Sequence, residues 1–522
     1  MVTVEMLCSA SELNHWRRQE AARPLHFVPT MGALHQGHQQ LLQRAAQCRA
    51  GVRPRVLLSV FVNPLQFGPA EDFERYPRDL ERDRQLAAAA GADALFAPAL
   101  AVIYPHGDQD TTRVQVPASL QRQLCGRSRP GHFDGVATVV CRLLALVRPD
   151  RLLLGEKDWQ QLVILRRVLE DLGLPLQLQG CATVREADGV PCSSRNRYLS
   201  AAERLRAAAL PAALAAARLE ALAQPQGAEA EALIAGVRRR LELADLQVDY
   251  VQLVRAHTLE PLPRSQGLSL LAAAVRCGSS RLIDHVVLMP RPPIVAIDGP
   301  AGAGKSTVTR AFASRLGLVY LDTGAMYRAL TWWVQRQGVD PAEAGAVASL
   351  LQGLDLRLSS AEGGMQRVEI NGHDVTEAIR SPEVTAQVSA VAAHGCVREA
   401  LTRQQQAMGA RGGLVAEGRD IGTAVFPDAD CKVFLTATVA ERARRRAEDL
   451  RQRGFPVPSL PELEASIAER DRLDSTRAVA PLLQADDAVE LVTDGLSIEA
   501  VIEVLVDLFR QRVPEEAWPG PS

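Results

Sequence analysis

The chain has 522 residues, of which 47% are hydrophobic and 23% are charged, and its formal net charge is −2 at pH 7. This composition is typical of a globular protein and excludes a disordered chain, and the length is typical of roughly two to four domains. Because the charge is nearly balanced, no global basic field attracts nucleic acid or an anionic membrane, and we expect neither as a partner.

Cysteine usage and hydropathy indicate the cellular location that we expect for the protein. Nine cysteines lie between Cys8 and Cys431, an odd number without any C-x-x-C pair, so neither a disulfide framework nor a zinc ribbon is expected. The most alanine- and leucine-rich stretch, residues 201–223, is interrupted by charged side chains and is not a membrane span. These patterns predict a cytoplasmic protein with no membrane partner.

The first part of the chain alternates short apolar runs with segments of helical periodicity. LHFVP, RVLLSVFVNP, ALFAP and RLLLGEK have the pattern of buried strands, and helical segments follow them. This alternation predicts βα units around a parallel sheet, over residues 1–200. Residues 201–242 predict alanine-rich helices, and VDYVQLV, LSLLAAAV and RLIDHVVL predict the strands of a small α+β lobe, so that the first domain covers residues 1–288.

The stretch PTMGALHQGH, residues 29–38, leaves the first strand of that series and enters a helix near His38, with Gly37 in a position suited to an N-cap. His35 and His38 therefore lie close to a helix N-terminus, where backbone N–H groups point at anions. A metal pair needs further protein ligands, and the neighbouring histidines form no cluster with these two. Two ordinary surface histidines remain the other alternative, but the strand–loop–helix context favours an anion site.

MPRPP, residues 289–293, predicts an extended linker, after which the βα order restarts and indicates a second α/β domain over residues 294–513. GPAGAGKS, residues 299–306, follows an apolar strand and opens a helix, as a phosphate-binding loop does. Glycines allow backbone N–H groups to surround an anion, while Lys305 reaches the β- and γ-phosphates and Ser306 holds Mg²⁺. The predicted ATP-binding residues are Gly299, Gly302, Gly304, Lys305, Ser306 and Thr307.

The first domain resembles the class I nucleotidyltransferases in its H-x-G-H motif, and more closely the pantothenate synthetases. That resemblance is carried by PTMGALHQGH, FVNPLQFG, YPRDLERD, RPGHFDGVATVV, GEKDWQQL and SSRNRYLS, which occur in that order. It implies a Rossmann-like domain that condenses pantoate with β-alanine through pantoyl adenylate, with Mg²⁺ and ATP, and a homodimer formed through this domain. By the same resemblance His38 is a proton donor, and His35 and Lys157 assist it at the phosphates.

The resemblance also implies the residues of two subsites. Gln66 and Gln161 hold pantoate and β-alanine. The ATP site comprises Met31, Gly32, Ala33, Leu34, His35, Gln36, Gly37, His38, Gly155, Glu156, Lys157, Asp158, Val184, Cys192, Ser193, Ser194 and Arg195. Cys192 departs from the methionine that is common in the family; a backbone contact survives this change, whereas packing of the side chain on adenine is weakened.

The second domain resembles bacterial cytidylate kinase, through LDTGAMYR, RVEINGHDVTEAIR, AEGRDIGTAVFPDA and ERDRLDSTRAVAP. The resemblance implies a P-loop nucleoside-monophosphate kinase that transfers phosphate from Mg²⁺-ATP to CMP or dCMP, with no organic cofactor in either domain. Arginines would hold the acceptor phosphate, and Asp474 and Ser389 would bind cytosine. The implied CMP site comprises Thr323, Tyr327, Arg328, Arg380, Ser389, Arg398, Arg419, Asp420, Arg470, Asp474 and Arg477.

Other interpretations stay open at this point. The arginine-rich run at residues 442–446 is either a solvated helix face or, beside a phosphate loop, an arginine lid. The second domain could phosphorylate UMP or another monophosphate, and one domain could be inactive, although His35, His38, Lys157, Lys305 and Ser306 are intact. The C-terminal EEAWPGPS is expected to fray.

Overall fold

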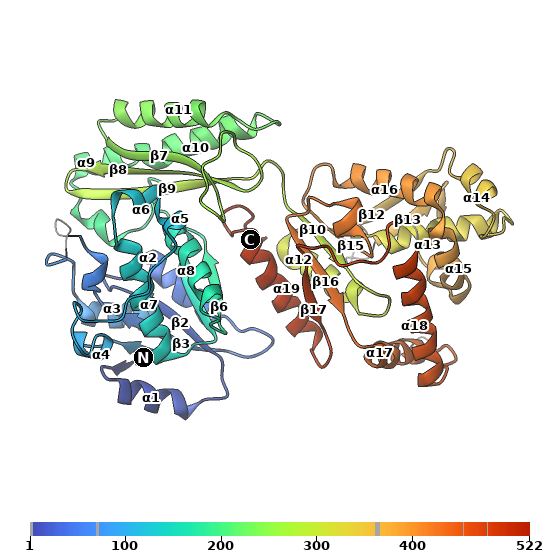
Figure 1. Cartoon of the computed structure of the whole chain (residues 1–522), viewed down its shortest axis with the longest axis horizontal. Coiled ribbons are helices and arrows are strands. Elements are labelled where there is room, and N and C mark those ends of the chain that lie inside the picture. Colours follow the sequence, from blue (N-terminus) through green and yellow to red (C-terminus); the bar gives the residue numbers. More distant parts are fainter. Residues whose placement is uncertain (1–3, 69–72, 361–365, 453, 478, 522) are drawn as a thin grey trace. The chain divides into compact units, whose positions relative to one another are not determined.

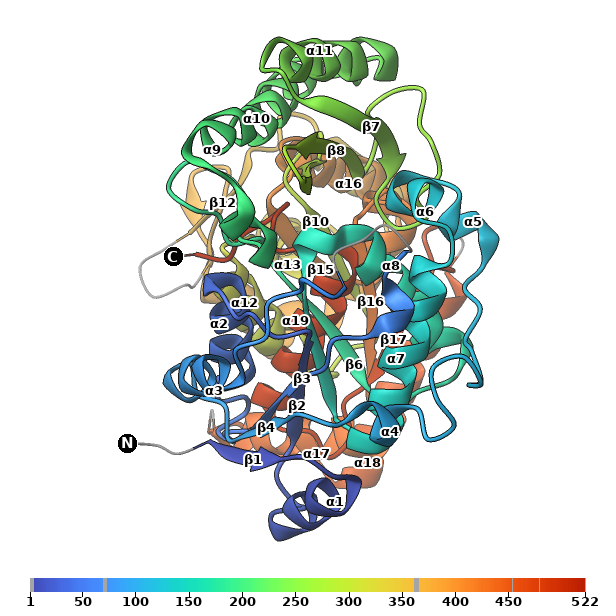
Figure 2. The same cartoon turned by 90° about the vertical axis from the view of Figure 1, so that its left-hand side faces the viewer.

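The computed structural model describes residues 4–68, 73–360, 366–452, 454–477 and 479–521. These residues form two compact units (Figures 1 and 2). The first unit contains Met1–Pro290 together with Pro514–Ala517, and the second contains Arg291–Val513 together with Trp518–Ser522. The chain therefore returns to the first unit for four residues near its C-terminus.

The first unit is built on a six-stranded sheet, in which every neighbouring pair of strands is parallel and the order is β1-β4-β3-β2-β5-β6. The strands are β1 (Glu5–Leu7), β2 (Leu25–Thr30), β3 (Arg55–Val60), β4 (Ala94–Phe96), β5 (Arg151–Gly155) and β6 (Gln177–Cys181). The helices are α1 (Ala10–Gln19), α2 (Gln36–Ala45), α3 (Leu80–Ala89), α4 (Leu100–Ile103), α5 (Ala118–Gln121), α6 (Leu124–Ser128), α7 (His132–Val147) and α8 (Trp159–Asp171). The predicted α/β class is confirmed, although β1 and β6 were not predicted.

The apolar runs of the sequence form the central strands because both faces of the sheet are buried. Successive residues of a strand point to opposite faces. Phe27, Leu57 and Leu152 accordingly belong to one hydrophobic cluster, and Val28, Leu58 and Leu153 belong to another. Strand order reverses between β2 and β5, and in such a sheet ligands bind beyond the carboxyl ends of the strands at this switch point. The loops that follow β2 and β5 are thus the expected positions of a site.

A small lobe completes the first unit. Its three predicted strands are present as β7 (Gln247–Arg255), β8 (Ser269–Cys277) and β9 (Ser280–Leu288), and they form an antiparallel sheet of order β7-β8-β9. The helices α9 (Ala201–Ala207), α10 (Ala209–Leu222) and α11 (Ala230–Leu243) share a hydrophobic core with this sheet. The structure therefore supports an α+β lobe over this part of the chain.

The second unit contains a five-stranded parallel sheet of order β11-β15-β10-β16-β17 and a small antiparallel sheet of order β12-β13-β14. The strands are β10 (Ile294–Asp298), β11 (Val319–Asp322), β12 (Leu356–Ser360), β13 (Gln366–Ile370), β14 (His373–Asp374), β15 (Leu414–Gly418), β16 (Cys431–Thr436) and β17 (Val489–Val492). Its helices are α12 (Lys305–Leu316), α13 (Thr323–Arg336), α14 (Ala344–Leu350), α15 (Pro382–Ala393), α16 (Gly395–Gly409), α17 (Val439–Gln452), α18 (Leu460–Thr476) and α19 (Ile498–Arg512).

The central strand β10 leads directly into the predicted phosphate loop and α12, so the strand–loop–helix order of the motif is confirmed. Within the parts of the chain that the structure describes, no helix is long and apolar enough to cross a membrane. The expected fraying of the C-terminus is wrong for Glu515 and Glu516, whose backbone N–H groups both donate hydrogen bonds.

Candidate active sites

The first site is built on the loop between β2 and α2, which carries both predicted histidines. His35, not Gly37, is the N-cap of α2: its Nδ1 accepts a hydrogen bond from the Gly37 N–H at 3.2 Å. His38 Nδ1 in turn accepts from the His35 N–H at 3.4 Å, and the ring centroids lie 4.0 Å apart. We expected Gly37 as the N-cap, but it lies in the first turn of the helix. The His35 imidazole supplies the capping acceptor instead.

This hydrogen bonding defines what the two imidazoles offer to a ligand. Because each Nδ1 accepts from a backbone N–H, the network assigns the proton of each neutral ring to Nε2. Burial, with the nearby Lys157 ammonium, lowers the pKa of His35 to about 4, and burial beside His35 lowers that of His38 well below its ordinary value. At neutral pH both rings are uncharged N–H donors, as suits hydrogen bonding to phosphate oxygens.

A carboxylate that the sequence analysis missed fixes the loop. Asp83, on α3, is buried and accepts hydrogen bonds from the N–H groups of Ala33 at 2.9 Å and Leu34 at 2.7 Å. The loop bends sharply here, with φ of 84° at Gly32 and 52° at Ala33. A Cβ on Gly32 would lie 2.8 Å from Asp83 Oδ2, so the glycine is required for this close approach.

Two further segments reach the same end of the sheet. Lys157 and Asp158 follow β5 in the turn η2 (Glu156–Asp158), and their charged groups lie 3.3 Å apart. Ser193 caps the turn η3 (Ser194–Tyr198) through a hydrogen bond from the Arg195 N–H at 3.3 Å. The Ser194 hydroxyl lies 3.2 Å from the hydroxyl of Tyr76.

Cys192, the predicted departure from the family, is buried beside the Gly37 amide of the histidine loop. Its own N–H donates to the Val184 carbonyl at 2.8 Å, so this backbone contact is present whatever the side chain. Burial raises the pKa of the thiol, which keeps it protonated and unreactive at neutral pH. Cys192 therefore packs the serine-containing segment against the first turn of α2.

A cavity of about 700 Å³ is lined by both predicted pantoate residues and by some of the predicted ATP-site residues of this unit. Six members of the predicted set line it: Gln66, Lys157, Asp158, Gln161, Ser193 and Arg195. His35 and His38 do not line it, although the charge of Lys157 acts on both rings. Of the other predicted residues, Gln36 is exposed, and the Glu156 carboxylate is buried and bound by the N–H groups of Glu515 and Glu516.

Gln66, in the turn η1 (Pro64–Gln66), is held by residues to which the sequence analysis gave no role. Its side-chain oxygen accepts from Asn63 Nδ2 at 3.1 Å, and its carbonyl lies 2.8 Å from His132 Nδ1 and accepts from Arg129 at 3.2 Å. Asn63 is fully buried, and its oxygen accepts from the Tyr104 hydroxyl at 2.8 Å. The motifs FVNPLQFG and RPGHFDG contained this signal, because they supply the two sides of this contact.

The second site is the phosphate loop of the other unit. Gly299, Gly302 and Gly304 all have positive φ, and a Cβ on Gly299 would lie 2.0 Å from the carbonyl oxygen of Leu435. Lys305 Nζ donates to the carbonyls of Gly299 at 2.7 Å and Pro300 at 2.8 Å. Burial lowers the pKa of Lys305. The motif thus forms a compact loop at the start of α12, with its lysine folded over it.

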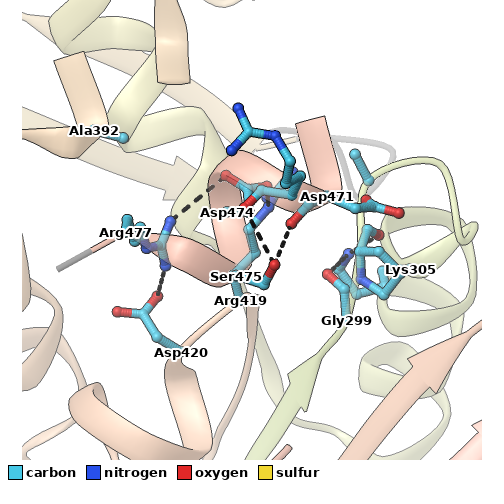
Figure 3. Close-up of polar contacts among 12 residues, drawn as sticks. Gly299, Lys305, Ala392, Arg419, Asp420, Asp471, Asp474, Ser475 and Arg477 are labelled. Carbon is cyan, nitrogen blue, oxygen red and sulfur yellow. Dashed lines mark hydrogen bonds and ion pairs between the residues drawn. The ribbon is translucent and has the colours of Figure 1, made fainter. Parts of the chain in front are cut away.

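The predicted acceptor site lies near this loop and consists of interlocked arginines and aspartates (Figure 3). Arg398 and Asp420 form a buried ion pair at 2.6 Å. Arg477 lies 3.7 Å from both Asp420 and Asp474, and Arg419 pairs with Asp474. Segments that are distant in sequence thus converge, as the resemblance implied.

The cationic character of this cluster exceeds what its carboxylates neutralise. Arg470 is buried enough that desolvation, with the adjacent Arg419, lowers its pKa to about 10, and its Nε has no hydrogen-bond partner among the described residues. Arg328 belongs to the same group of charges and pairs with Asp322 at 2.9 Å. Such a site favours a dianionic ligand, because arginine binds phosphate through paired N–H donors.

The remaining predicted residues have separate settings. Tyr327 lies under the Arg398 guanidinium, 5.3 Å from it, and the Thr323 hydroxyl donates to the Glu417 carbonyl at 2.7 Å. Arg380 lies 3.7 Å from Glu377 at the end of η4 (Ala378–Arg380). Ser389 is half-buried on α15, which packs against the helix α18 that carries Asp474.

Two arginines of the run at residues 442–446 donate hydrogen bonds to backbone carbonyls of the phosphate loop. Arg442 donates to the Ala301 carbonyl at 3.2 Å and pairs with Asp471 through both terminal nitrogens. Arg445 donates to the Ala303 carbonyl at 3.2 Å. The solvated-face interpretation is therefore wrong for these two side chains. In this structure they hold the phosphate loop and do not form a lid over it.

Comparison with known proteins agrees with this geometry. Residues 4–287 match the family model described as pantoate-beta-alanine ligase, and residues 295–511 match the one described as cytidylate kinase. Relatives named bifunctional pantoate ligase/cytidylate kinase include one from Parasynechococcus marenigrum (strain WH8102), 66% identical over 96% of this chain and 97% of its own, and one from Prochlorococcus marinus (strain MIT 9313), 63% identical over 97% and 99%. The crystal structure of pantothenate synthetase from Thermus thermophilus is similar with a TM-score of 0.50 and 45% identity, over 55% of this chain and all of that one.

The fold and the two sites define an enzyme of two α/β units, in each of which a glycine-containing loop leads from a parallel strand into a helix. One unit has the features of a ligase and the other those of a nucleotide kinase. The chain belongs to the bifunctional pantoate ligase/cytidylate kinase family.

Proposed function

We propose that the first unit condenses pantoate with β-alanine in two steps. An oxygen of the pantoate carboxylate attacks the α-phosphorus of ATP, the bond to the β-phosphate breaks, and pyrophosphate leaves. The β-alanine amine then attacks the acyl carbon, loses a proton, and displaces AMP to give pantothenate. Activation is needed because a free carboxylate is a poor acyl donor.

The observation that supports this proposal is the shared cavity, in which amide side chains and cationic groups lie side by side. Gln66 and Gln161 suit a hydroxy acid, while Lys157, Ser193 and Arg195 suit phosphates. The neutral Nε2–H groups of the histidine pair add donors at the nearby helix N-terminus. We therefore assign His38 and His35 to hydrogen bonding at the phosphates during the first step. Proton donation, which the resemblance implied for His38, is not part of this assignment, because a ring that is neutral at neutral pH has no extra proton to transfer.

The second unit, in our proposal, transfers the γ-phosphoryl group of ATP to CMP or dCMP. A phosphate oxygen of the monophosphate attacks the γ-phosphorus and ADP leaves, so no general base is needed, but the approach of two anions requires cations. Lys305 and the arginine cluster supply them, and Arg470 is the strongest support because its buried Nε lacks a partner in the described part of the chain. Asp474 would accept from the cytosine amino group.

Mg²⁺ would enter both sites with ATP, where it neutralises phosphate charge. In the second unit the Ser306 hydroxyl faces the buried Glu417 carboxylate, and these hard oxygen donors fit Mg²⁺. No group of three or more His, Cys, Asp or Glu residues that could hold a metal occurs among the described residues. Ser306 is thus our proposed ligand, with the remaining ligands coming from phosphate and water.

We further propose that the enzyme is cytoplasmic. All nine cysteines are unpaired in the structure, and thiols stay reduced in the cytoplasm. A homodimer through the ligase domain stays a prediction.

A paired assay on the whole chain tests both activities. We expect AMP release that depends on pantoate and β-alanine, and ADP release that depends on CMP. His38→Ala is expected to abolish the first and spare the second, and Lys305→Ala to do the reverse. Loss of both activities in either variant would contradict independent sites, and absence of one activity from the wild type would show that unit to be inactive.

A further inference from the structure

Four residues beyond the last kinase helix belong to the first unit. Helix α19 ends at Arg512, and Pro514–Ala517 packs with Met1–Pro290. We call Pro514–Ala517 the return segment. Its two glutamates make most of its polar contacts, and all of these contacts lie within the first unit.

The backbone of the return segment is bound by one buried carboxylate. Glu156 is 1% exposed, and its two oxygens accept from the N–H groups of Glu515 at 2.9 Å and Glu516 at 3.0 Å. Burial and the Glu516 carboxylate raise the pKa of Glu156 to about 7. Leaving such a buried carboxylate without hydrogen-bond donors would be costly in free energy. The buried acceptor implies that the return segment is an integral part of the first unit.

The side chains of the return segment bind three other elements. The Glu516 carboxylate accepts from the Thr183 N–H at 2.9 Å and from the Thr183 hydroxyl, and lies 3.2 Å from Nε2 of the buried His285 on β9. Glu515 pairs with Arg44 on α2 and accepts from the Ala182 N–H at 3.2 Å. Burial alone would raise the pKa of Glu516, but His285 and Thr183 outweigh it and lower the pKa to about 2.

Three of the contacted elements carry or adjoin a segment of the proposed ligase site: the turn after β5, the loop after β6 and helix α2. Glu156 directly precedes Lys157 and Asp158. Thr183 directly precedes Val184, whose carbonyl binds the backbone of Cys192 at the start of the serine-containing turn. Arg44 lies on α2, which begins with the histidine loop. The return segment therefore connects the three segments that would surround the ATP phosphates.

We propose that the return segment is a positioning element of the ligase, so that adenylate formation depends on residues encoded after the kinase domain. Glu516 is its principal positioning residue, because its carboxylate joins the strand β9 of the lobe to the loop that follows β6. This inference rests on the proposed ligase activity. It also predicts that the first 290 residues alone leave the buried Glu156 without its two amide donors.

The test uses the full chain with Glu516→Ala, Glu516→Gln and the control Glu499→Ala. Glu499 is a matched glutamate on the exposed first turn of α19. Two half-reactions are measured on enzyme of known active-site concentration: pantoate-dependent exchange of pyrophosphate into ATP, and pantothenate formation from supplied pantoyl adenylate. Phosphorylation of CMP is followed in the same preparations.

For Glu516→Ala we expect the exchange rate to fall about tenfold or more, since small displacements of catalytic groups have effects of this size, and amide formation to fall less. Glu516→Gln keeps an oxygen for Thr183 and should recover part of the loss, while Glu499→Ala and all CMP phosphorylation should match the wild type. Unchanged exchange in Glu516→Ala, or an equal loss in both half-reactions, would overturn the inference. Wild-type chain without exchange would instead refute the proposed ligase function.

Discussion

Replacing Asp83 by alanine should impair the ligase while leaving the kinase intact, because this carboxylate holds the histidine loop. Ala33 and Leu34 are both buried, and their N–H groups would lose the acceptor that now binds them. Hydrogen bonds to a charged group contribute about 1.5–3 kcal/mol each. Partial relaxation of the loop would recover some of the summed value, so we expect a net loss of about 3 kcal/mol in the free energy that holds the loop.

A loss of about 3 kcal/mol in positioning corresponds to roughly a hundredfold fall in kcat/KM, at about 1.36 kcal/mol for each factor of ten. The assay is pantothenate formation at low substrate, with CMP phosphorylation in the same tube as an internal control. Asp79→Ala is the matched control: Asp79 is the N-cap of α3 and accepts from the Arg82 N–H at 3.1 Å, but does not bind the loop. It should weaken α3 without a comparable effect on the ligase.

Asp83→Asn adds an internal gradation. Asparagine keeps one acceptor oxygen but turns an N–H₂ group toward the other backbone donor, so its effect should be at least half that of alanine in free energy. Ligase kcat/KM within threefold of the wild type in Asp83→Ala would refute the reasoning. An equal loss in Asp79→Ala would attribute the effect to α3 as a whole.

Three further changes test other contacts. Asp474→Ala should lower the ratio of kcat/KM for CMP over UMP about tenfold or more with little change in the KM for ATP, and an unchanged ratio would remove Asp474 from cytosine recognition. Burial lowers the pKa of His26 to about 4 despite its contact with a backbone carbonyl at 2.7 Å, so the unfolded chain binds the extra proton first as the pH falls below about 6.5. Between pH 6.5 and 4 the free energy of unfolding of this unit should therefore fall by about 3 kcal/mol more in the wild type than in His26→Asn. Denaturant titrations measure this difference, and an equal fall in both proteins would contradict the prediction. A Cβ on Gly135 would lie 2.0 Å from the Leu65 carbonyl oxygen. Gly135→Ala should therefore displace the Gln66 turn and raise the KM for pantoate several-fold. An unaltered KM would show that the turn is not part of the pantoate site.

Local patterns predicted a large part of both sites because the chemistry lies in short segments. The phosphate loop needs only a strand, its glycines and a helix, all within residues 294–316, and the structure has them in that order. The histidine loop was placed correctly at a helix N-terminus for the same reason. Its N-cap was wrong by two residues, because an imidazole nitrogen can accept the capping hydrogen bond as a hydroxyl does.

Contacts between distant segments could not be predicted in this way. Asp83 lies about fifty residues after the loop it binds, and its position in an ordinary helix gives no sign of that role. Arg442 and Arg445 illustrate the same limit, because their charge suggested a phosphate lid while the structure uses them on loop carbonyls. The return segment was misjudged because residues near a chain end are expected to fray. The buried Glu156 carboxylate, far away in the sequence, binds the backbone N–H groups of Glu515 and Glu516 and orders them.

The two proposed sites differ in how they would offset phosphate charge, and the difference follows from their proposed reactions. In the kinase site both reactants are phosphate anions, and the structure supplies Lys305 with several buried arginines whose charges are only partly neutralised. In the proposed ligase site one reactant is a single carboxylate, and the cationic Lys157 and Arg195 are joined by two imidazoles that burial keeps neutral. In our proposal these neutral N–H donors bind phosphate without also pairing strongly with the pantoate carboxylate, which must remain free to attack. Because two of its proposed phosphate donors are uncharged, we expect the ligase to depend on how those donors are placed, and distant supports such as Asp83 and Glu516 are expected to matter there.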